Sequence, residues 1–171
     1  MRSIFPRLFI ECAASRPSRD WSKLKLSRRD AVELVNLSYN KDYGTSVIDQ
    51  VMAVYRVRAP VLYRGLTPPE ASQASRGFVI PTSMTEDRKE AEFFAREMYK
   101  TRVVIELRGA SGFPYWQWLL DNSKYVPRDL RRDTLELASK EREWLLPRRT
   151  VLDVVGETQV GDLKILRTKR A

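Results

Sequence analysis

Hydrophobic residues recur at helical spacing in the first third of the chain, and they predict two helices. Ser27 begins the first helix with a pattern close to a capping box, in which Asp30 takes the place of the usual glutamate. Apolar residues then follow at intervals of three and four positions as far as about Tyr39. Thr45 or Ser46 can cap the second helix, whose apolar residues have the same kind of spacing.

After about residue 60 the pattern changes to short apolar runs separated by turn residues. We expect strands at 61–64, 78–80, 102–107, 144–146, 151–155 and 163–166. One amphipathic helix, from Glu86 to about Tyr99, interrupts them, and Thr85 can cap it. Helices come first and strands follow, which indicates an α+β fold rather than an alternating βαβ series.

Three stretches between these elements are less regular. Pro68 and Pro69 suit the first turn of a short helix. The stretch 114–120 is aromatic and can form a helix. Residues 121–139 are mostly polar and contain Pro127, so we expect a long loop there with room for one helical turn.

The length of 171 residues fits one domain, with a helical part at 1–60 and a β-rich part at 61–171. No stretch approaches the roughly 18 apolar residues that a membrane-spanning helix needs. The first residues do not make a cleaved signal peptide, because Pro6, Arg7 and Glu11 interrupt the segment that would have to be apolar. We therefore expect a soluble, cytoplasmic and monomeric protein without a membrane partner.

Histidine is absent and cysteine occurs once, as Cys12. These counts exclude nucleophile systems that need histidine, the usual histidine-containing zinc sites, an internal disulfide and a CxxC metal site. We expect no metal. Any catalysis must use carboxylates, hydroxyls, arginine, lysine and the backbone.

Lysine and arginine outnumber aspartate and glutamate by 31 to 22, which gives a net charge of +9. The excess is spread along the chain and is marked within residues 1–30 and near the C-terminal end. Such a field attracts an acidic protein surface, a nucleic acid or a phosphate-rich ligand. Charge alone does not choose among them, and it is equally compatible with a basic protein that binds no nucleic acid.

The first candidate motif is Leu-Tyr-Arg-Gly-Leu at 62–66, which places Arg64 and Gly65 at a strand end. A guanidinium can fork onto phosphate or ribose oxygens, and a glycine lets a ligand approach the backbone. The second motif is Pro-Thr-Ser-Met-Thr at 81–85, where Ser83 and Thr85 share one face of an extended chain. Taken singly, these motifs are typical of a solvated arginine and of a strand edge before a helix.

The third candidate motif is Glu141-Arg142-Glu143, which precedes the apolar segment 144–146 and Pro147. On a strand, residues two positions apart point the same way, so we expect both carboxylates to face one site. A short run of charges is more often a solvated strand start.

In their order and spacing the three motifs resemble the Arg-Ser-Glu class of mono-ADP-ribosyltransferases, found among bacterial toxins and bacteriophage enzymes. In that class an aromatic-Arg-Gly stretch ends a strand and a Ser-x-Ser/Thr motif follows. Ala-x-x-Phe-Ala then begins six residues after the last hydroxyl, as Ala91 follows Thr85 here. A Glu-x-Glu motif finally enters an apolar strand that ends in Leu-Pro or Ile-Pro. The resemblance covers about residues 61–156 and is nearest to small bacteriophage enzymes that modify host proteins.

The resemblance implies an α+β fold with a two-sheet β core, N-terminal helices and one long helix after the Ser-x-Thr motif. The substrate would be NAD⁺, and the absence of histidine excludes the sister class built on His-Tyr-Glu. Arg64 would hold the diphosphate or its nearby ribose, and Gly65 would offer its backbone to the nicotinamide carboxamide. Ser83 would bind and orient Glu143, while Thr85 stands where the family often has serine. Glu143 would stabilise the positive charge that develops on the ribose as nicotinamide leaves.

The same resemblance implies that Glu141 positions or deprotonates the acceptor. Glutamate rather than glutamine at this position goes with arginine as the acceptor, because a guanidinium pairs with a carboxylate in a forked geometry. Residues 125–140 correspond to the target-recognising loop of the family and are rich in arginine. We therefore expect a host protein with an acidic surface as the partner. The aromatic stretch 112–116 either covers the nicotinamide or phosphates, or packs in the core.

Several alternatives stay open at this point. The acceptor can be a nucleic acid, which the net charge of +9 would favour. The chain can instead be a basic RNA-binding module without activity, although it lacks RRM or KH signatures. Hydrolysis of NAD⁺ without transfer is a further possibility. The sequence does not distinguish a phage enzyme acting in its host's cytoplasm from a bacterial toxin.

Overall fold

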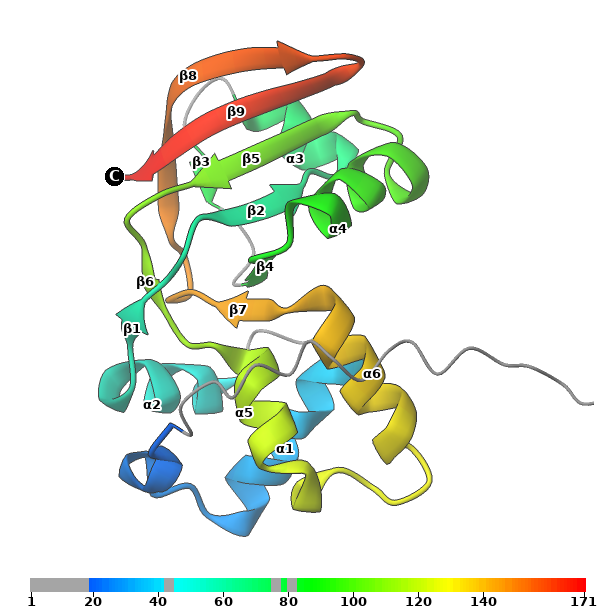
Figure 1. The fold of residues 1–171 in the computed structure, drawn as a ribbon. Coiled ribbons are helices and arrows are strands. Elements are labelled where there is room, and N and C mark those ends of the chain that lie inside the picture. Colours follow the sequence, from blue (N-terminus) through cyan, green and yellow to red (C-terminus); the bar gives the residue numbers. More distant parts are fainter. Residues whose placement is uncertain (1–18, 42–44, 75–77, 80–82) are drawn as a thin grey trace, which may run out of the picture.

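Most of the helices lie at one end of the molecule, and the main sheet with its flanking helices lies at the other (Figure 1). The computed structural model describes residues 19–41, 45–74, 78–79 and 83–171. The α+β class that the hydrophobic pattern predicts is confirmed. Predictions that concern residues 1–18, Ile80, or Pro81 and Thr82 lie outside the described residues.

The helical end combines elements from both halves of the chain. They are η1 (Trp21–Leu24), α1 (Arg28–Asn40), α2 (Ser46–Val54), α5 (Tyr115–Asp121), η4 (Ser123–Tyr125) and α6 (Arg131–Glu141). The capping box of α1 is confirmed, because Asp30 N donates to Ser27 Oγ at 3.1 Å and Ser27 N donates to Asp30 Oδ2 at 3.2 Å. No helix of the described segments is long and apolar enough to cross a membrane.

The main sheet has the strand order β3-β8-β9-β5-β2-β4-β7. Its strands are β2 (Leu62–Gly65), β3 (Phe78–Val79), β4 (Ser83–Thr85), β5 (Val103–Leu107), β7 (Glu143–Leu145), β8 (Val151–Val160) and β9 (Leu163–Arg170). β5 and β9 are parallel, and the other neighbouring strands are antiparallel. β1 (Val57–Arg58) pairs with β6 (Ser111–Gly112) in a second, small sheet. The two sheets form the expected β core.

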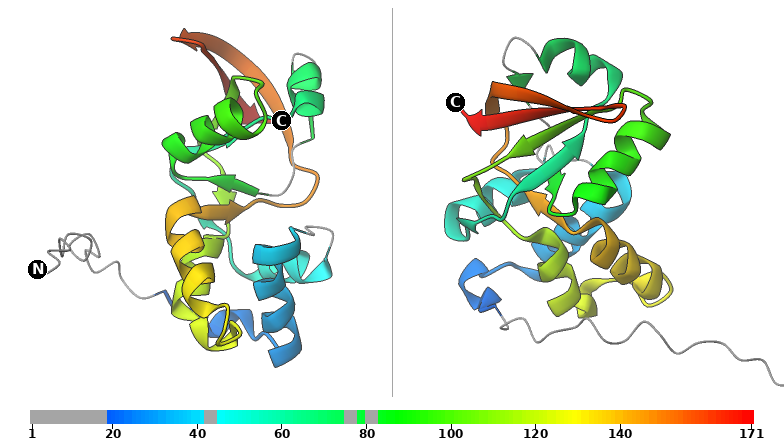
Figure 2. Two further views of the ribbon diagram at one scale, coloured as in Figure 1. Left: turned by 90° about the vertical axis from the view of Figure 1, so that its right-hand side faces the viewer. Right: turned by 45° about the horizontal axis from the view of Figure 1, so that its top comes forward.

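Helices α3 (Pro68–Gln73) and α4 (Arg88–Phe93) lie on opposite sides of the main sheet (Figure 2). α4 continues into a π-helical turn, η3 (Phe94–Met98), so the long helix expected after the Ser-x-Thr motif is present. Its cap differs from the prediction. Asp87 Oδ1 accepts from the backbone N–H groups of Lys89 and Glu90, whereas Thr85 is the last residue of β4.

The loop predicted over 121–139 is wrong in its second half, because residues 131–141 form α6. This helix is mostly polar and buries two small side chains, Thr134 and Ala138, against the helical end of the molecule. A buried face this narrow produces no repeat of large apolar residues, which is the pattern that reveals a helix in a sequence. Arg131 and the residues after it therefore look like a polar loop.

The aromatic stretch 112–116 belongs to the core. Phe113, Tyr115 and Trp116 are at most 7% exposed. Tyr115 Oη donates to the carbonyl oxygen of Leu34 at 2.7 Å, which fastens α5 to α1. One hydrophobic cluster contains these residues together with side chains of α1, α2, β2, β5 and β7, so the helical and sheet ends share a core.

Gly65 allows α4 to lie close against β2. A Cβ atom at this position would lie 2.6 Å from the carbonyl oxygen of Ala91 and 2.7 Å from the backbone nitrogen of Ala95. Both are backbone atoms of a helix, so neither can move aside by itself. The glycine predicted to let a ligand approach is thus also required by the packing of helix on strand.

We predict that Gly65→Ala lowers the free energy of unfolding by about 1–3 kcal/mol, because the added methyl group forces the helix away from the strand. Urea denaturation followed by circular dichroism measures the change. Gly156→Ala is the matched control, since the three atoms nearest to its Cβ would all belong to the flexible side chain of Arg167. Equal losses in the two variants would contradict the packing argument.

Candidate active site

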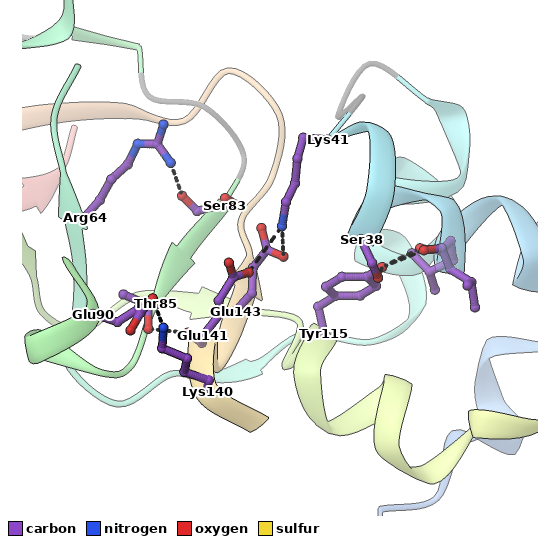
Figure 3. A network of polar contacts seen from close by, with 12 residues as sticks. Ser38, Lys41, Arg64, Ser83, Thr85, Glu90, Tyr115, Lys140, Glu141 and Glu143 are labelled. Atoms are coloured by element: carbon purple, nitrogen blue, oxygen red, sulfur yellow. Dashed lines mark hydrogen bonds and ion pairs between the residues drawn. The ribbon is translucent and has the colours of Figure 1, made fainter. Parts of the chain in front are cut away.

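One pocket of about 210 Å³ contains all six residues that the motifs single out. They are Arg64, Gly65, Ser83, Thr85, Glu141 and Glu143. The remaining lining residues are Lys41, Tyr63, Met84, Glu90, Ala91, Phe94 and Tyr99. The pocket therefore lies among the end of α1, strands β2, β4 and β7, helix α4 with its continuation η3, and the end of α6, and Figure 3 shows several of its lining side chains.

Glu141 and Glu143 reach the pocket by a route that the sequence pattern does not predict. Glu141 is the last residue of α6, and only Glu143 belongs to a strand. Arg142 between them has φ 44°, in the left-handed region, and turns the chain sharply from helix into strand. The expectation that both glutamates lie on one strand is wrong, yet their carboxylates converge: the Oε2 atom of each lies 3.3 Å from Lys41 Nζ.

Thr85, the last residue of β4, and Glu86 after it hold this turn in place. Thr85 Oγ1 donates to the carbonyl oxygen of Glu141, and Glu86 N donates to the carbonyl oxygen of Arg142 at 3.3 Å. The Glu86 carboxylate accepts from Trp144 Nε1 at 2.9 Å and lies 3.9 Å from Arg142 Nη1. The carbonyl groups that end α6 are thus satisfied by the neighbouring strand, which fixes the direction in which Glu141 points.

The pairing of β4 with β7 brings Thr85, rather than Ser83, directly opposite Glu143. Thr85 pairs with Glu143 and Ser83 pairs with Leu145, so Ser83 is a diagonal neighbour of the buried carboxylate. The carbonyl oxygen of Ser83 accepts from Arg64 Nη1 at 3.1 Å. The predicted hydrogen bond from the Ser83 hydroxyl to Glu143 stays a prediction.

Arg64 is held by two groups and keeps one buried donor free. Its Nη1 binds Ser83 O, and its Nη2 lies 3.2 Å from Glu70 Oε1. The second oxygen of Glu70 accepts from the N–H and hydroxyl groups of Thr67, the cap of α3. Arg64 Nε is buried and has no hydrogen-bond partner among the described residues. A buried donor without a partner is costly, so this nitrogen is suited to an oxygen atom of a ligand.

Lys41 is a pocket residue that the motifs do not reveal. It follows the end of α1 with φ 51°, and its side chain crosses to the two glutamates (Figure 3). Burial disfavours the charged ammonium, but the carboxylates of Glu143 and Glu141 outweigh this effect, so the pKa of Lys41 is raised. The sequence places it in the polar loop 40–44 as one of nine lysines in the chain, and only the folded chain shows its partners.

Glu90 is a third carboxylate in the pocket, also missed by the sequence reasoning. It lies on α4, is 9% exposed, and has Lys140 Nζ at 3.7 Å. Burial raises the pKa of Glu90, the ammonium of Lys140 opposes the rise, and the carboxylates of Glu141 and Asp87 add to it.

The pocket offers different chemistry at its two sides. Arg64 presents a guanidinium donor, which suits phosphate or ribose oxygens. The two glutamates present negative charge, which suits a cation or a developing positive charge. Phe94 and Tyr99 give the pocket an apolar surface as well, and their rings stack with their centroids 5.8 Å apart. Within the described ranges, no group of three or more acidic or cysteine side chains is arranged to hold a metal ion.

We predict that Thr85→Val lowers the free energy of unfolding by about 1–3 kcal/mol, because the carbonyl oxygen of Glu141 and the N–H group of Asp87 both lose their partner. Thr85→Ser keeps the hydroxyl and should stay close to the wild-type value. Chemical denaturation of the three proteins makes the comparison. A serine variant as unstable as the valine variant would refute the hydrogen-bonding argument.

We predict that Glu90→Gln is more stable than the wild type at pH 7. Because the pKa of Glu90 is raised in the folded state, ionisation of this carboxyl costs stability as the pH rises through that value. Below the ordinary glutamate pKa both side chains are neutral, so the difference in thermal midpoint should vanish near pH 4. The exposed Glu136→Gln on α6 serves as the control for the loss of one negative charge.

Solved structures with the same fold are ADP-ribosyltransferases. HopU1 of Pseudomonas syringae pv. tomato matches with a TM-score of 0.50 and 14% identity, over 74% of this chain and 50% of its own, so this chain spans half the length of that one. Vis, a toxin from Vibrio splendidus, matches in a complex with the M6 inhibitor with a TM-score of 0.50 and 14% identity, over 89% of this chain and 77% of its own. No protein-family model and no curated protein matches the sequence. The resemblance predicted from the three motifs is thus confirmed at the level of the fold, and the chain has the ADP-ribosyltransferase fold.

Proposed function

We propose that the protein is an NAD⁺-dependent mono-ADP-ribosyltransferase that modifies arginine side chains of a host protein. The observation that carries this proposal is the convergence of Arg64, Thr85, Glu141 and Glu143 on one pocket. Three separate stretches of the sequence supply these residues, around positions 64, 85 and 141–143, so their meeting is not a consequence of local sequence alone. The ADP-ribosyltransferase fold supports the same conclusion.

Arg64 is the residue that we assign to the diphosphate of NAD⁺ or its nearby ribose. Its free Nε atom would gain an acceptor when these oxygens bind. Glu70 keeps the guanidinium fixed before the substrate arrives, because the same carboxylate is anchored to Thr67 by two hydrogen bonds. Gly65, Ser83 and Thr85 would complete the substrate-binding side of the pocket, as the motifs predict.

Glu143 is the residue that we assign to the bond-breaking step. Its side chain is 10% exposed, so its charge acts with little screening by water. Cleavage of the bond between the ribose and nicotinamide leaves positive charge on the ribose, and a fixed carboxylate stabilises that charge. Nicotinamide leaves as a neutral molecule with the electron pair of the broken bond.

Glu141 is the residue that we assign to the acceptor. A guanidinium can place two N–H groups on its carboxylate, and the acceptor nitrogen then forms the new bond to the ribose carbon. The proton that this nitrogen loses passes to Glu141. The end of α6 thus presents Glu141 to the incoming side chain, and the arginines at 128, 131 and 132 would face an acidic patch of the target.

We predict that Glu143→Gln lowers the rate of ADP-ribose transfer about 100- to 1000-fold, since a neutral amide does not stabilise the positive ribose. Incubation of the protein with labelled NAD⁺ and a cell lysate measures transfer. Glu136→Gln, an exposed substitution on α6, should retain full activity. Unchanged labelling by Glu143→Gln, or no labelled macromolecule with the wild type, would disprove the proposal.

Digestion of the labelled product identifies the class of acceptor. Label that is released by protease and resists nuclease belongs to a protein, and mass spectrometry then names the modified residue type. The opposite result would assign a nucleic-acid acceptor to the same fold, which is the reading that the net charge of +9 favours. Free labelled ADP-ribose alone would indicate hydrolysis without transfer.

A further inference from the structure

The ammonium of Lys41 lies between the two carboxylates that the proposed reaction needs. Its Nζ atom is 3.3 Å from Glu141 Oε2 and 3.3 Å from Glu143 Oε2. Figure 3 shows the side chain extended from the end of α1 to the glutamates, on the opposite side of the pocket from Arg64. The contact therefore joins the helical end of the molecule to the catalytic side of the sheet.

This arrangement differs from an ordinary surface ion pair. The side chains of Glu141 and Glu143 are 18% and 10% exposed, whereas that of Lys41 is 42% exposed. Two carboxylates close together and shielded from water repel each other, and one cation between them offsets that repulsion. Because the lysine side chain is partly exposed, solvent lies next to it and its ammonium can be rehydrated there when another cation takes its place.

The place of the ammonium is also the place where a cationic acceptor would pair with Glu141. A guanidinium that bound there in a forked geometry would use both oxygens of Glu141, including the Oε2 atom that Lys41 Nζ already contacts, and the two positive charges would repel each other at this distance, which favours the departure of Lys41. The backbone of Lys41 is tied to α1, where its N–H group donates to the carbonyl oxygen of Leu37 at 3.2 Å. Its side chain can therefore leave while the helix end stays in place.

We propose, on the basis of the function proposed above, that Lys41 determines acceptor specificity by occupying the acceptor's place with an internal cation. An acceptor is then modified only when it binds Glu141 more tightly than the Lys41 ammonium does. An arginine on a docked protein meets this condition because the rest of the interface adds binding energy and raises its local concentration. A small free guanidine, or a water molecule, has no such support and is disfavoured.

Lys41 is suited to act as a competitor and not as an acceptor itself. An amine attacks the ribose only when it has lost its proton, and the carboxylates of Glu143 and Glu141 hold the pKa of Lys41 above its ordinary value. The side chain therefore stays charged at neutral pH. A role limited to orienting the two glutamates is the competing explanation, and it predicts a different kinetic result.

Lys41→Met tests the proposal, because methionine keeps an unbranched stem and removes the charge. Agmatine serves as the small guanidine acceptor, and nicotinamide release is measured at saturating NAD⁺. We expect KM for agmatine to fall about fivefold or more, with kcat changed little and hydrolysis of NAD⁺ without acceptor increased. Lys41→Arg should keep the wild-type values, and the exposed Lys89→Met on α4 controls for the loss of one positive charge.

The outcomes separate this proposal from the function on which it rests. An unchanged or raised KM for agmatine in Lys41→Met overturns the competition, and a fall in kcat at constant KM assigns Lys41 a positioning role instead. If neither the wild type nor the variant releases nicotinamide, the proposed function fails. In that case, calorimetric titration of agmatine without NAD⁺ still tests whether Lys41 competes with the acceptor. The competition requires agmatine to bind Lys41→Met more tightly than the wild type. Thermal unfolding of both proteins checks that the substitution leaves the fold intact.

Discussion

The sharp turn at Arg142 is the constraint on which the rest of the pocket depends. It places the last residue of α6 and the first residue of β7 side by side, so that Glu141 and Glu143 converge although they belong to different elements. The turn is satisfied from outside, by the hydroxyl of Thr85 and by the backbone and carboxylate of Glu86. Because these partners belong to β4 and the residue after it, the geometry of the two carboxylates is set by how β4 pairs with β7. A change in that pairing would therefore first displace the carboxylates of the two glutamates.

Charge balance follows from the same geometry. Each charged group on the two sides of the pocket has an internal partner: Arg64 has Glu70, and the two glutamates have Lys41. Such pairs keep the charged groups in place at a modest net energy, because the attraction is offset by the loss of hydration. A cationic ligand that binds the glutamates must exchange partners with Lys41, whereas an anionic ligand can use the free Nε atom of Arg64. The pocket is thus selective even before any shape complementarity is considered, since the two sides accept ligand groups of opposite charge.

Much of the fold could be predicted from the sequence, because capping and periodicity are local. The capping box at Ser27 and the prolines that begin α3 have the expected structures. The helix α6 could not be predicted, since it buries two small side chains and otherwise looks like a polar loop. The cap of α4 was missed because Asp87 and Thr85 are both good caps, and the pairing of β4 with β7 decides between them. Local sequence rules identify the residues that can cap a helix, but the pairing of strands in the folded chain decides which of them does so.

The candidate site likewise contains residues that could be predicted from the sequence and residues that could not. Arg64, Ser83 and Glu143 could be singled out because their order and spacing along the chain match a known pattern, and the structure brings them to one pocket. Lys41 and Glu90 could not, since each is an ordinary charged residue whose importance comes from partners about 100 and 50 positions away, respectively. Thr85 was expected as a substitute for serine, and its contact with Glu141 O gives it a further structural role that no motif describes.

The π-helical turn after α4 has a consequence for the apolar wall of the pocket. In an α-helix, side chains five positions apart point in different directions, and neighbours on one face are three or four apart. Here Tyr99 N donates to the carbonyl oxygen of Phe94 at 2.8 Å, and the wider turn stacks the rings of these two residues on one side, where both line the pocket. The shape of this apolar wall therefore depends on the pitch of the helix as well as on the types of residue that form it. Without this wider turn, Phe94 and Tyr99 would lie five positions apart on a regular helix and one ring would rotate away, so a change of helical pitch could alter the pocket's width during evolution without any substitution at a ligand-facing position.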